Sequence, residues 1–142
     1  MYDKIYDGLL QAICSNRKVF HVVLTTSTGH KDDYERLRKD FLEFYKRICD
    51  FQKKNLDYYV VLTDEGNGTV HCLMVDLMIP RERLSSWWSS IHGAYIVRKP
   101  EVNKEYFKDK NFSDVQVVNF MARYMANQKN IVYSWCSDGW LD

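Results

Sequence analysis

Proline and glycine are scarce in this chain, with two Pro and six Gly among 142 residues. This scarcity excludes a long disordered tail and a collagen-like segment. A dominant charge is missing too, because 20 Lys and Arg residues oppose 19 Asp and Glu residues, for a formal net charge of +1. The balance excludes a strongly basic protein that coats nucleic acid, although it permits a local basic patch.

Long apolar runs and paired cysteines are absent as well. No apolar stretch reaches the length needed to cross a bilayer, and the first residues, MYDKIYDG, lack the basic-then-apolar pattern of a signal peptide. We therefore expect a soluble intracellular protein with no membrane contact. The four cysteines form no C-x-x-C pair, so we predict free thiols rather than a zinc ribbon or a disulfide framework; they are Cys14, Cys49, Cys72 and Cys136.

Hydrophobic residues make up 46% of the chain, which is enough for one packed core. The length suits a single domain over residues 1–142, because two halves would each have a thin core. The clearest element is a helix over residues 34–51, where apolar residues recur every three or four positions. We predict shorter helices at residues 2–13, 81–90 and 113–127. Runs of β-branched residues predict strands at residues 19–26, 57–63, 69–79 and 94–97.

These elements follow the order strand, helix, strand, strand, helix, strand, with an additional helix behind them. An Asn-Gly turn joins the second and third strands as a hairpin. The order predicts an α+β fold: a ferredoxin-like split β-α-β antiparallel sheet with its helices on one face. The other face would then be free for a site, and the aromatic tail over residues 131–141 should dock onto the core.

His71 and Tyr124 are the residues most suited to chemistry, although neither is persuasive alone. Side chains alternate along a strand, so His71 and Leu73 share one face of the third strand while Cys72 points to the other. A single histidine on a central strand is more often held by a structural hydrogen bond. A tyrosine on a helix is likewise more often a packing residue.

The order of the segments around His71 and Tyr124 favours a chemical role over a structural one. The segments FHVVLTT (residues 20–26), EGNGTVHCLM (65–74) and VVNFMARYMAN (117–127) resemble the three motifs of rolling-circle replication initiators, the HUH endonuclease (Rep) superfamily. The compact Rep proteins of archaeal viruses and plasmids are the most similar. LSSWWSSIHGAYIV (84–97) and the terminal YSWCSDGWL extend the resemblance over most of the chain. The family's fold is the split β-α-β sheet predicted above.

The resemblance implies a metal-assisted DNA nickase and strand transferase. In the family, a tyrosine oxygen attacks a DNA phosphodiester and leaves a 5′-phosphotyrosine and a free 3′-hydroxyl, while Mg²⁺ or Mn²⁺ polarises the phosphate. Carried over residue by residue, His71 matches the first metal histidine and Tyr124 the nucleophile. Phe120 stands where two-tyrosine members have their other tyrosine, which implies a single-tyrosine enzyme.

Two positions depart from the family pattern. Leu73 stands where the second metal histidine belongs, and Asn127 replaces a lysine that often follows the nucleophile. One imidazole is a poor site for a hard cation, so the metal hypothesis requires another ligand.

Glu65, in the turn that leads into the strand of His71, is our preferred second ligand. Asp64 is the reserve, and His21 on the first strand is a further imidazole whose direction the sequence does not reveal. The alternative is that Glu65 and Asp64 are ordinary turn residues.

Four basic residues are predicted to contact DNA: Lys99, Lys104, Arg123 and Lys129. Together with Lys108 and Lys110 they lie among aromatic residues, so cations would neutralise phosphates while rings stack on unpaired bases. The opposing interpretation is a solvated loop over a hydrophobic rim. The expected partner is single-stranded DNA at a replication origin or genome terminus, in a host cytoplasm. Adjacent Trp87 and Trp88 also suggest a homodimer contact or a covered sheet edge.

Three functions remain open, and the structure should separate them. An active nickase places Tyr124 against His71 on an open surface. A catalytically inactive Rep-like protein that binds DNA or a replication partner keeps that surface without a convergent carboxylate. An unrelated interaction module buries Tyr124 in its core. No P-loop is present, so we expect no ATPase activity.

Overall fold

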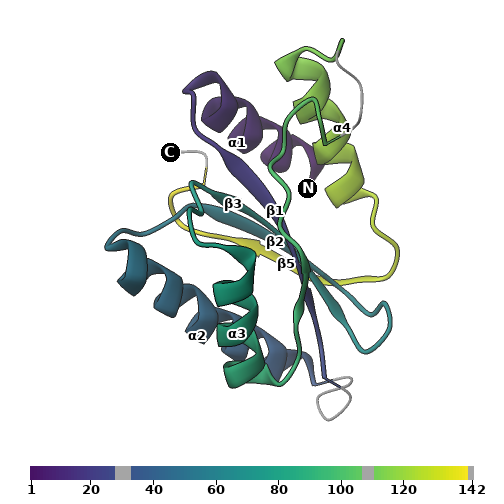
Figure 1. Cartoon of the computed structure of the whole chain (residues 1–142). Helices are drawn as coiled ribbons and strands as arrows, with labels where there is room; N and C mark the ends of the chain where they lie inside the picture. The colour runs from purple at the N-terminus through teal and green to yellow at the C-terminus, as the bar shows by residue number, and fades with distance from the viewer. Residues whose placement is uncertain (28–32, 107–110, 141–142) are drawn as a thin grey trace.

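The computed structural model describes residues 1–27, 33–106 and 111–140. The helices are α1 (Tyr2–Cys14), α2 (Tyr34–Gln52), α3 (Arg81–His92) and α4 (Asp114–Ala126). The strands are β1 (Val19–Thr25), β2 (Tyr58–Thr63), β3 (Thr69–Val75), β4 (Ile96–Arg98) and β5 (Ile131–Cys136). These helices and strands follow one another in the order α1-β1-α2-β2-β3-α3-β4-α4-β5, and Figure 1 shows their arrangement.

The five strands form one sheet in the order β4-β1-β3-β2-β5, and each neighbouring pair is antiparallel. The predicted α+β class is therefore confirmed. The tail docks on the core as expected, but it does so as an edge strand, β5, that the sequence pattern did not reveal. Strand β3 ends earlier than predicted because Asp76 adopts a positive φ of 56°, and its carboxylate accepts the backbone N–H of Lys18.

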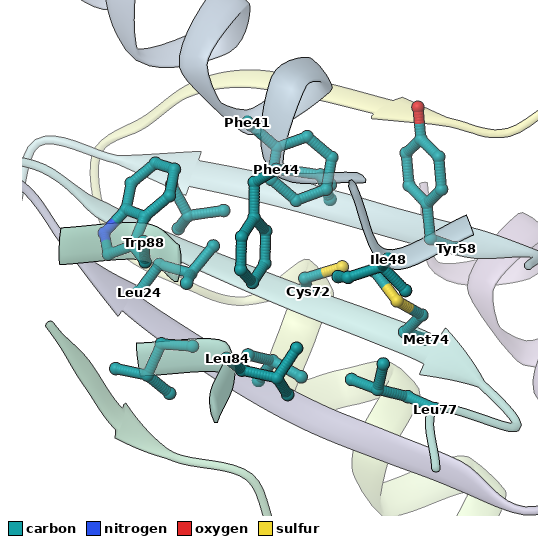
Figure 2. Packing of buried hydrophobic residues seen from close by; sticks show 14 of the residues in the cluster. Leu24, Phe41, Phe44, Ile48, Tyr58, Cys72, Met74, Leu77, Leu84 and Trp88 are labelled. Carbon is teal, nitrogen blue, oxygen red and sulfur yellow. The ribbon is translucent and has the colours of Figure 1, made fainter. Parts of the chain in front are cut away.

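One face of the sheet packs against α2 and α3. Figure 2 shows Phe41, Phe44 and Ile48 of α2 lying with Leu84 and Trp88 over the strands. The strands contribute every second residue to this cluster, as alternation requires; from β1 and β3 these are Val22, Leu24, Val70, Cys72 and Met74. Trp87 is half-buried at the margin, with its ring 5.4 Å from that of Phe51.

The opposite face is covered by α1 and α4, so the prediction that the helices lie on one face is wrong. Leu73 and Val75 of β3 face this second cluster, together with Ile5 and Leu9 of α1 and Met121 of α4. The physical reason is that β2 and β3 are apolar on both faces, and each helix also carries an apolar stripe that must be buried. A capping box formed by Ser113 and Gln116 starts α4.

Two further predictions concern the thiols and the bilayer. The four cysteines are unpaired, as expected, and Cys72 lies on the α2/α3 face. Within the part of the chain that the structure describes, no helix is long and apolar enough to span a bilayer.

Candidate active site

Two histidines meet on the α1/α4 face of the sheet. In the antiparallel register of β1 and β3, His21 lies opposite Leu73 and Val23 lies opposite His71. His21 and Leu73 therefore share a face, and His71, two residues before Leu73, shares it too. The imidazoles are diagonal neighbours, with His21 Nε2 3.3 Å from His71 Nδ1. Both are buried, at 0% and 4% exposure.

His21 is also held from its other side. Its Nδ1 lies 2.9 Å from the hydroxyl of Tyr106, and Arg98 donates from 3.5 Å to the same oxygen. A turn positions Tyr106, because Asn103 Oδ1 accepts the backbone N–H groups of Glu105 and Tyr106. The result is a continuous hydrogen-bonded chain from Arg98 on β4 through Tyr106 and His21 to His71.

Tyr124 projects from α4 onto this histidine pair. Its ring meets those of His21 and His71 edge to face, at centroid distances of 5.4 and 6.0 Å. The side chain is nevertheless 37% exposed, so one side touches the imidazoles and the other faces solvent. The interaction-module interpretation required a buried Tyr124, and the structure does not have one.

Burial keeps both imidazoles uncharged near neutral pH. The pKa of His21 falls to about 3, first through desolvation and then through the neighbouring His71 and the Arg98 cation. The pKa of His71 is also lowered by desolvation, with Arg98 adding to the effect and the negative charge of Glu65 opposing it. A neutral imidazole carries one free nitrogen lone pair, which is the form that binds a metal or accepts a proton.

His71 Nε2 has no hydrogen-bond partner among the described residues, although the atom is buried. Buried polar groups are nearly always paired, so an orphaned ring nitrogen requires an explanation. A lone pair on this atom would bind a cation or accept a hydrogen bond from a donor.

An open groove runs beside Tyr124. Glu65 from the β2–β3 turn lines one part of it, while α4 and the segment after it supply the rest: Phe120, Arg123, Asn127, Gln128 and Lys129. Phe120 lies one helical turn before Tyr124 and stacks on Phe112, with ring centroids 5.0 Å apart. The groove thus combines two cations, a carboxylate and an exposed ring around the tyrosine.

The predicted site residues do not all converge here. Glu65, Arg123 and Lys129 line the groove with Tyr124, and the His71 ring contacts the ring of Tyr124. Lys99 instead lies over the ring of Phe20, 4.2 Å from its centroid, and Phe20 packs on the α2/α3 side of the sheet.

Two further predicted residues stay at the margin. Lys104 is exposed in the turn that carries Tyr106 and is absent from the described lining of the groove, as is Asp64. Lys108 and Lys110 lie outside the described residues.

Two of the predicted metal donors, His71 and Glu65, lie in this region. His71 Nε2 offers an orphaned imidazole lone pair, and the Glu65 carboxylate is close enough to perturb the pKa of that ring. Mg²⁺ and Mn²⁺ bind through few protein groups and retain several waters. Within the described ranges, no group of three or more His, Cys, Asp or Glu side chains is placed to hold an ion.

From the sequence, His21 was named only as a further imidazole of unknown direction, and the contacts that Tyr106 and Arg98 make with this site were not predicted. For His21 a usable signal existed, because a sheet that places β1 beside β3 makes it a diagonal neighbour of His71. Tyr106 and Arg98 reach the site from a turn and from a three-residue strand, so no periodicity marks them. Comparison with protein-family models, with curated proteins and with solved structures gave no match.

Proposed function

We propose that the chain is a replication initiator that nicks and rejoins single-stranded DNA, with Tyr124 as the nucleophile. The observation that carries this proposal is the pairing of a half-exposed Tyr124 with a buried imidazole whose Nε2 has no partner among the described residues. A tyrosine that only packs in the core would be buried and would not lie beside an unpaired imidazole nitrogen. The site of action that we propose is an origin or genome terminus in the host cytoplasm, with the protein acting alone or as a homodimer.

The strand order supports the finer part of the proposal, a ferredoxin-like, Rep-like fold. The segment from β1 to β4 runs strand, helix, strand, strand, helix, strand, and its strands are arranged β4-β1-β3-β2 with antiparallel neighbours. This is the connectivity of a split β-α-β unit. In this interpretation α1, α4 and β5 are additions, and α4 brings the tyrosine to the sheet.

The proposed reaction is a transesterification at phosphorus. The Tyr124 oxygen forms a bond to the phosphorus of a DNA phosphodiester while the bond from phosphorus to the 3′ oxygen breaks. The phenol proton leaves to solvent in the open groove, and the departing 3′ oxygen takes up a proton to become a hydroxyl. Because the protein–DNA bond is itself a phosphodiester, the strand can be rejoined by the reverse attack without ATP.

His71 Nε2 and the Glu65 carboxylate are the groups that would hold Mg²⁺ or Mn²⁺. When bound, the cation would polarise the scissile phosphate and offset charge that develops on it. The uncharged state of His71 matters for this role, since a protonated imidazole has no lone pair to offer.

The groove supports binding of an unpaired strand. Arg123 and Lys129 supply positive charge on either side of Tyr124, and Phe120 presents a ring already backed by Phe112. Cations neutralise phosphates while exposed rings stack on bases in a sequence-tolerant way.

The test is incubation with labelled single-stranded oligonucleotides and Mn²⁺, followed by denaturing gels that separate free DNA, shortened DNA and protein–DNA adduct. We expect cleavage and an adduct with the natural chain and neither with Tyr124→Phe, which removes only the hydroxyl. Tyr133→Phe is the matched control, because Tyr133 is also exposed but lies on β5. An adduct that survives Tyr124→Phe would refute the assignment of the nucleophile.

One observation favours a second candidate, a Rep-like protein that binds DNA without cutting it. Leu73 is fully buried in the α1/α4 cluster, and the described part of the chain holds no three-residue metal cluster. That candidate predicts binding of single strands with no adduct at any Mn²⁺ concentration. The gel assay above therefore separates the two functions.

A further inference from the structure

His21 has no part in the transesterification proposed above, yet it is completely buried and both of its ring nitrogens are engaged. Nε2 meets His71 Nδ1 and Nδ1 meets the Tyr106 hydroxyl. Burying an imidazole on a largely apolar sheet face costs free energy, and here the ring bridges two polar groups. Its position next to His71 indicates a purpose connected with that residue.

We propose that His21 is a positioning residue that fixes the tautomer of His71, so that the His71 proton stays on Nδ1 and the lone pair on Nε2 is free for a ligand. The inference rests on the proposed function, because it concerns how the site keeps one imidazole ready for a cation or a proton. It gives β1 the role of orienting His71, which itself lies on β3.

The hydrogen-bond pattern favours this tautomer. If His71 carried its proton on Nε2, that N–H would be a buried donor with no acceptor among the described residues. With the proton on Nδ1, the N–H donates to His21 Nε2 across 3.3 Å, and the two ring planes are only 15° apart. The unpaired group on His71 is then a lone pair, which a cation can satisfy.

The other hydrogen bonds, between His21 and Tyr106 and between Arg98 and Tyr106, are consistent with the same tautomer of His71. His21 must then donate from Nδ1, and the Tyr106 oxygen 2.9 Å away accepts that bond as well as one from Arg98. Metal-binding histidines generally donate their other N–H to such a partner, which fixes ring orientation and raises basicity.

His21 is not a substitute for a metal histidine at position 73. Although it lies opposite Leu73 in the register, binding an ion would require it to abandon either His71 or Tyr106. The structure therefore divides two roles between two strands: His71 on β3 offers the ligand atom and His21 on β1 orients it.

The direct test is a long-range ¹H–¹⁵N NMR spectrum of the protein labelled with ¹⁵N-histidine, recorded without DNA and without metal. We expect His71 in the natural chain to be neutral with its proton on Nδ1, the less common tautomer of free histidine. His21→Gln should preserve that tautomer, since the amide oxygen can accept the same N–H, whereas His21→Leu should shift it to Nε2. A proton on Nε2 in the natural chain, or no shift in His21→Leu, would overturn the inference.

A second readout is direct Mn²⁺ binding, measured by the loss of the free-ion electron paramagnetic resonance signal. Removing the orienting partner should weaken binding by about 10- to 100-fold in His21→Leu, and His21→Gln should recover most of it. Phe20→Leu, one residue away and on the other face of β1, is the control for general strand damage and should leave binding unchanged. Equal weakening in all three variants would contradict a specific role for His21.

The two proposals fail in different ways. The proposed function fails if no oligonucleotide gives a Tyr124 adduct, whatever the tautomer of His71. The positioning role fails on the NMR spectrum alone, even if the adduct forms. Because the spectrum needs neither substrate nor metal, it tests the role of His21 even if the gel assay detects no cleavage and no adduct.

Discussion

The two faces of the sheet each bury histidine, and the two clusters are built differently. On the α2/α3 face, His92 donates from Nδ1 to Asp40 at 2.8 Å, accepts the Ser27 backbone N–H at Nε2 from 3.4 Å, and stacks on Trp88. On the α1/α4 face, His21 and His71 bond to each other, and within the described residues neither bonds to a carboxylate. His71 Nε2 is left over.

Under the proposed function, this difference separates a structural histidine, His92, from a ligand-binding one, His71. His92 satisfies both of its nitrogens inside the protein, so nothing outside is required to complete it. His71 satisfies only one, and it does so beside an exposed tyrosine and an open groove. Mutations on the first face should therefore change stability, while mutations on the second should also change function.

The largest effect should come from breaking the hydrogen bond between His92 and Asp40 on the α2/α3 face. Asp40→Ala leaves the buried Nδ1–H of His92 without its acceptor, which costs about 1–3 kcal/mol, and it also removes the ion pair with Arg36. Urea unfolding should register this loss, and Asp40→Asn should cost less because the amide can still accept from Nδ1. DNA nicking per folded molecule should stay at the natural level. A loss of nicking in folded Asp40→Ala would mean that the two faces are not independent.

For His71→Leu we expect the main effect on DNA nicking rather than on stability. Because the substitution leaves the buried Nε2 of His21 without its donor, the free energy of unfolding should fall by about 1–3 kcal/mol. Nicking in Mn²⁺ should fall by roughly 100-fold or more, because the orphaned ring nitrogen is gone. Gel-based cleavage rates and urea unfolding of the same preparation measure both. Unchanged nicking would make His71 a structural residue like His92.

Acid should destabilise the protein because unfolding lets the buried His21 on the α1/α4 face take up a proton. Its folded-state pKa of about 3 lies below the ordinary value of 6.5, so the unfolded chain binds more protons between these values. The stabilisation is fully present above pH 6.5 and is lost as the pH falls toward 3. Between pH 7 and pH 5 the natural chain should lose about 2 kcal/mol more than His21→Gln. Parallel pH dependences in urea unfolding would argue against a neutral buried His21.

Phe120→Ala should weaken binding of single strands by about 1–3 kcal/mol, the range for one stacked base. Phe51 is the matched control, because it is similarly exposed but lies on α2. Fluorescence anisotropy with a labelled oligonucleotide measures both variants, and Phe51→Ala should leave affinity unchanged. Equal weakening in the two variants would indicate nonspecific hydrophobic adsorption rather than a stacking site.

The smallest effect concerns salt dependence. Removing one cation that neutralises a phosphate of a single strand should reduce the slope of log K against log salt by about 0.7. We expect this reduction for Arg123→Ala and for Lys129→Ala, which line the groove, but not for Lys99→Ala, which lies over Phe20. Affinities measured across a salt series test it. A reduced slope for Lys99→Ala would place DNA on the other face as well.

Much of the fold could be predicted from the sequence, because periodicity reports local structure well. The apolar stripe of α2 and the β-branched runs of β1 to β3 gave their type and nearly their limits. Strand β5 escaped because it lies at an edge and is only half-buried, so its residues alternate weakly. The covering of the second face by α1 and α4 escaped because periodicity shows that a helix has an apolar side, not what it packs against.

The site was predicted only where it follows from one strand or one helix. Tyr124 and His71 could be named from motif positions and Glu65 from its place in the turn before β3. Tyr124 and Glu65 line one groove, and the His71 ring contacts that of Tyr124. Contacts such as that of His21 with His71 depend on which strands are neighbours, which no local pattern encodes. Lys99 was misplaced for the same reason, since a residue near the end of a short strand can lie toward either face.

The most direct measurement is to locate the covalent bond. After incubation with single-stranded oligonucleotides and Mn²⁺, the protein is digested with trypsin and its peptides are weighed by mass spectrometry. Cleavage after Arg123 and Lys129 releases residues 124–129, YMANQK, in which Tyr124 is the only tyrosine. The account predicts a nucleotide attached to this peptide. Attachment to any other tyrosine peptide, or intact DNA that remains bound to unmodified protein, would contradict it.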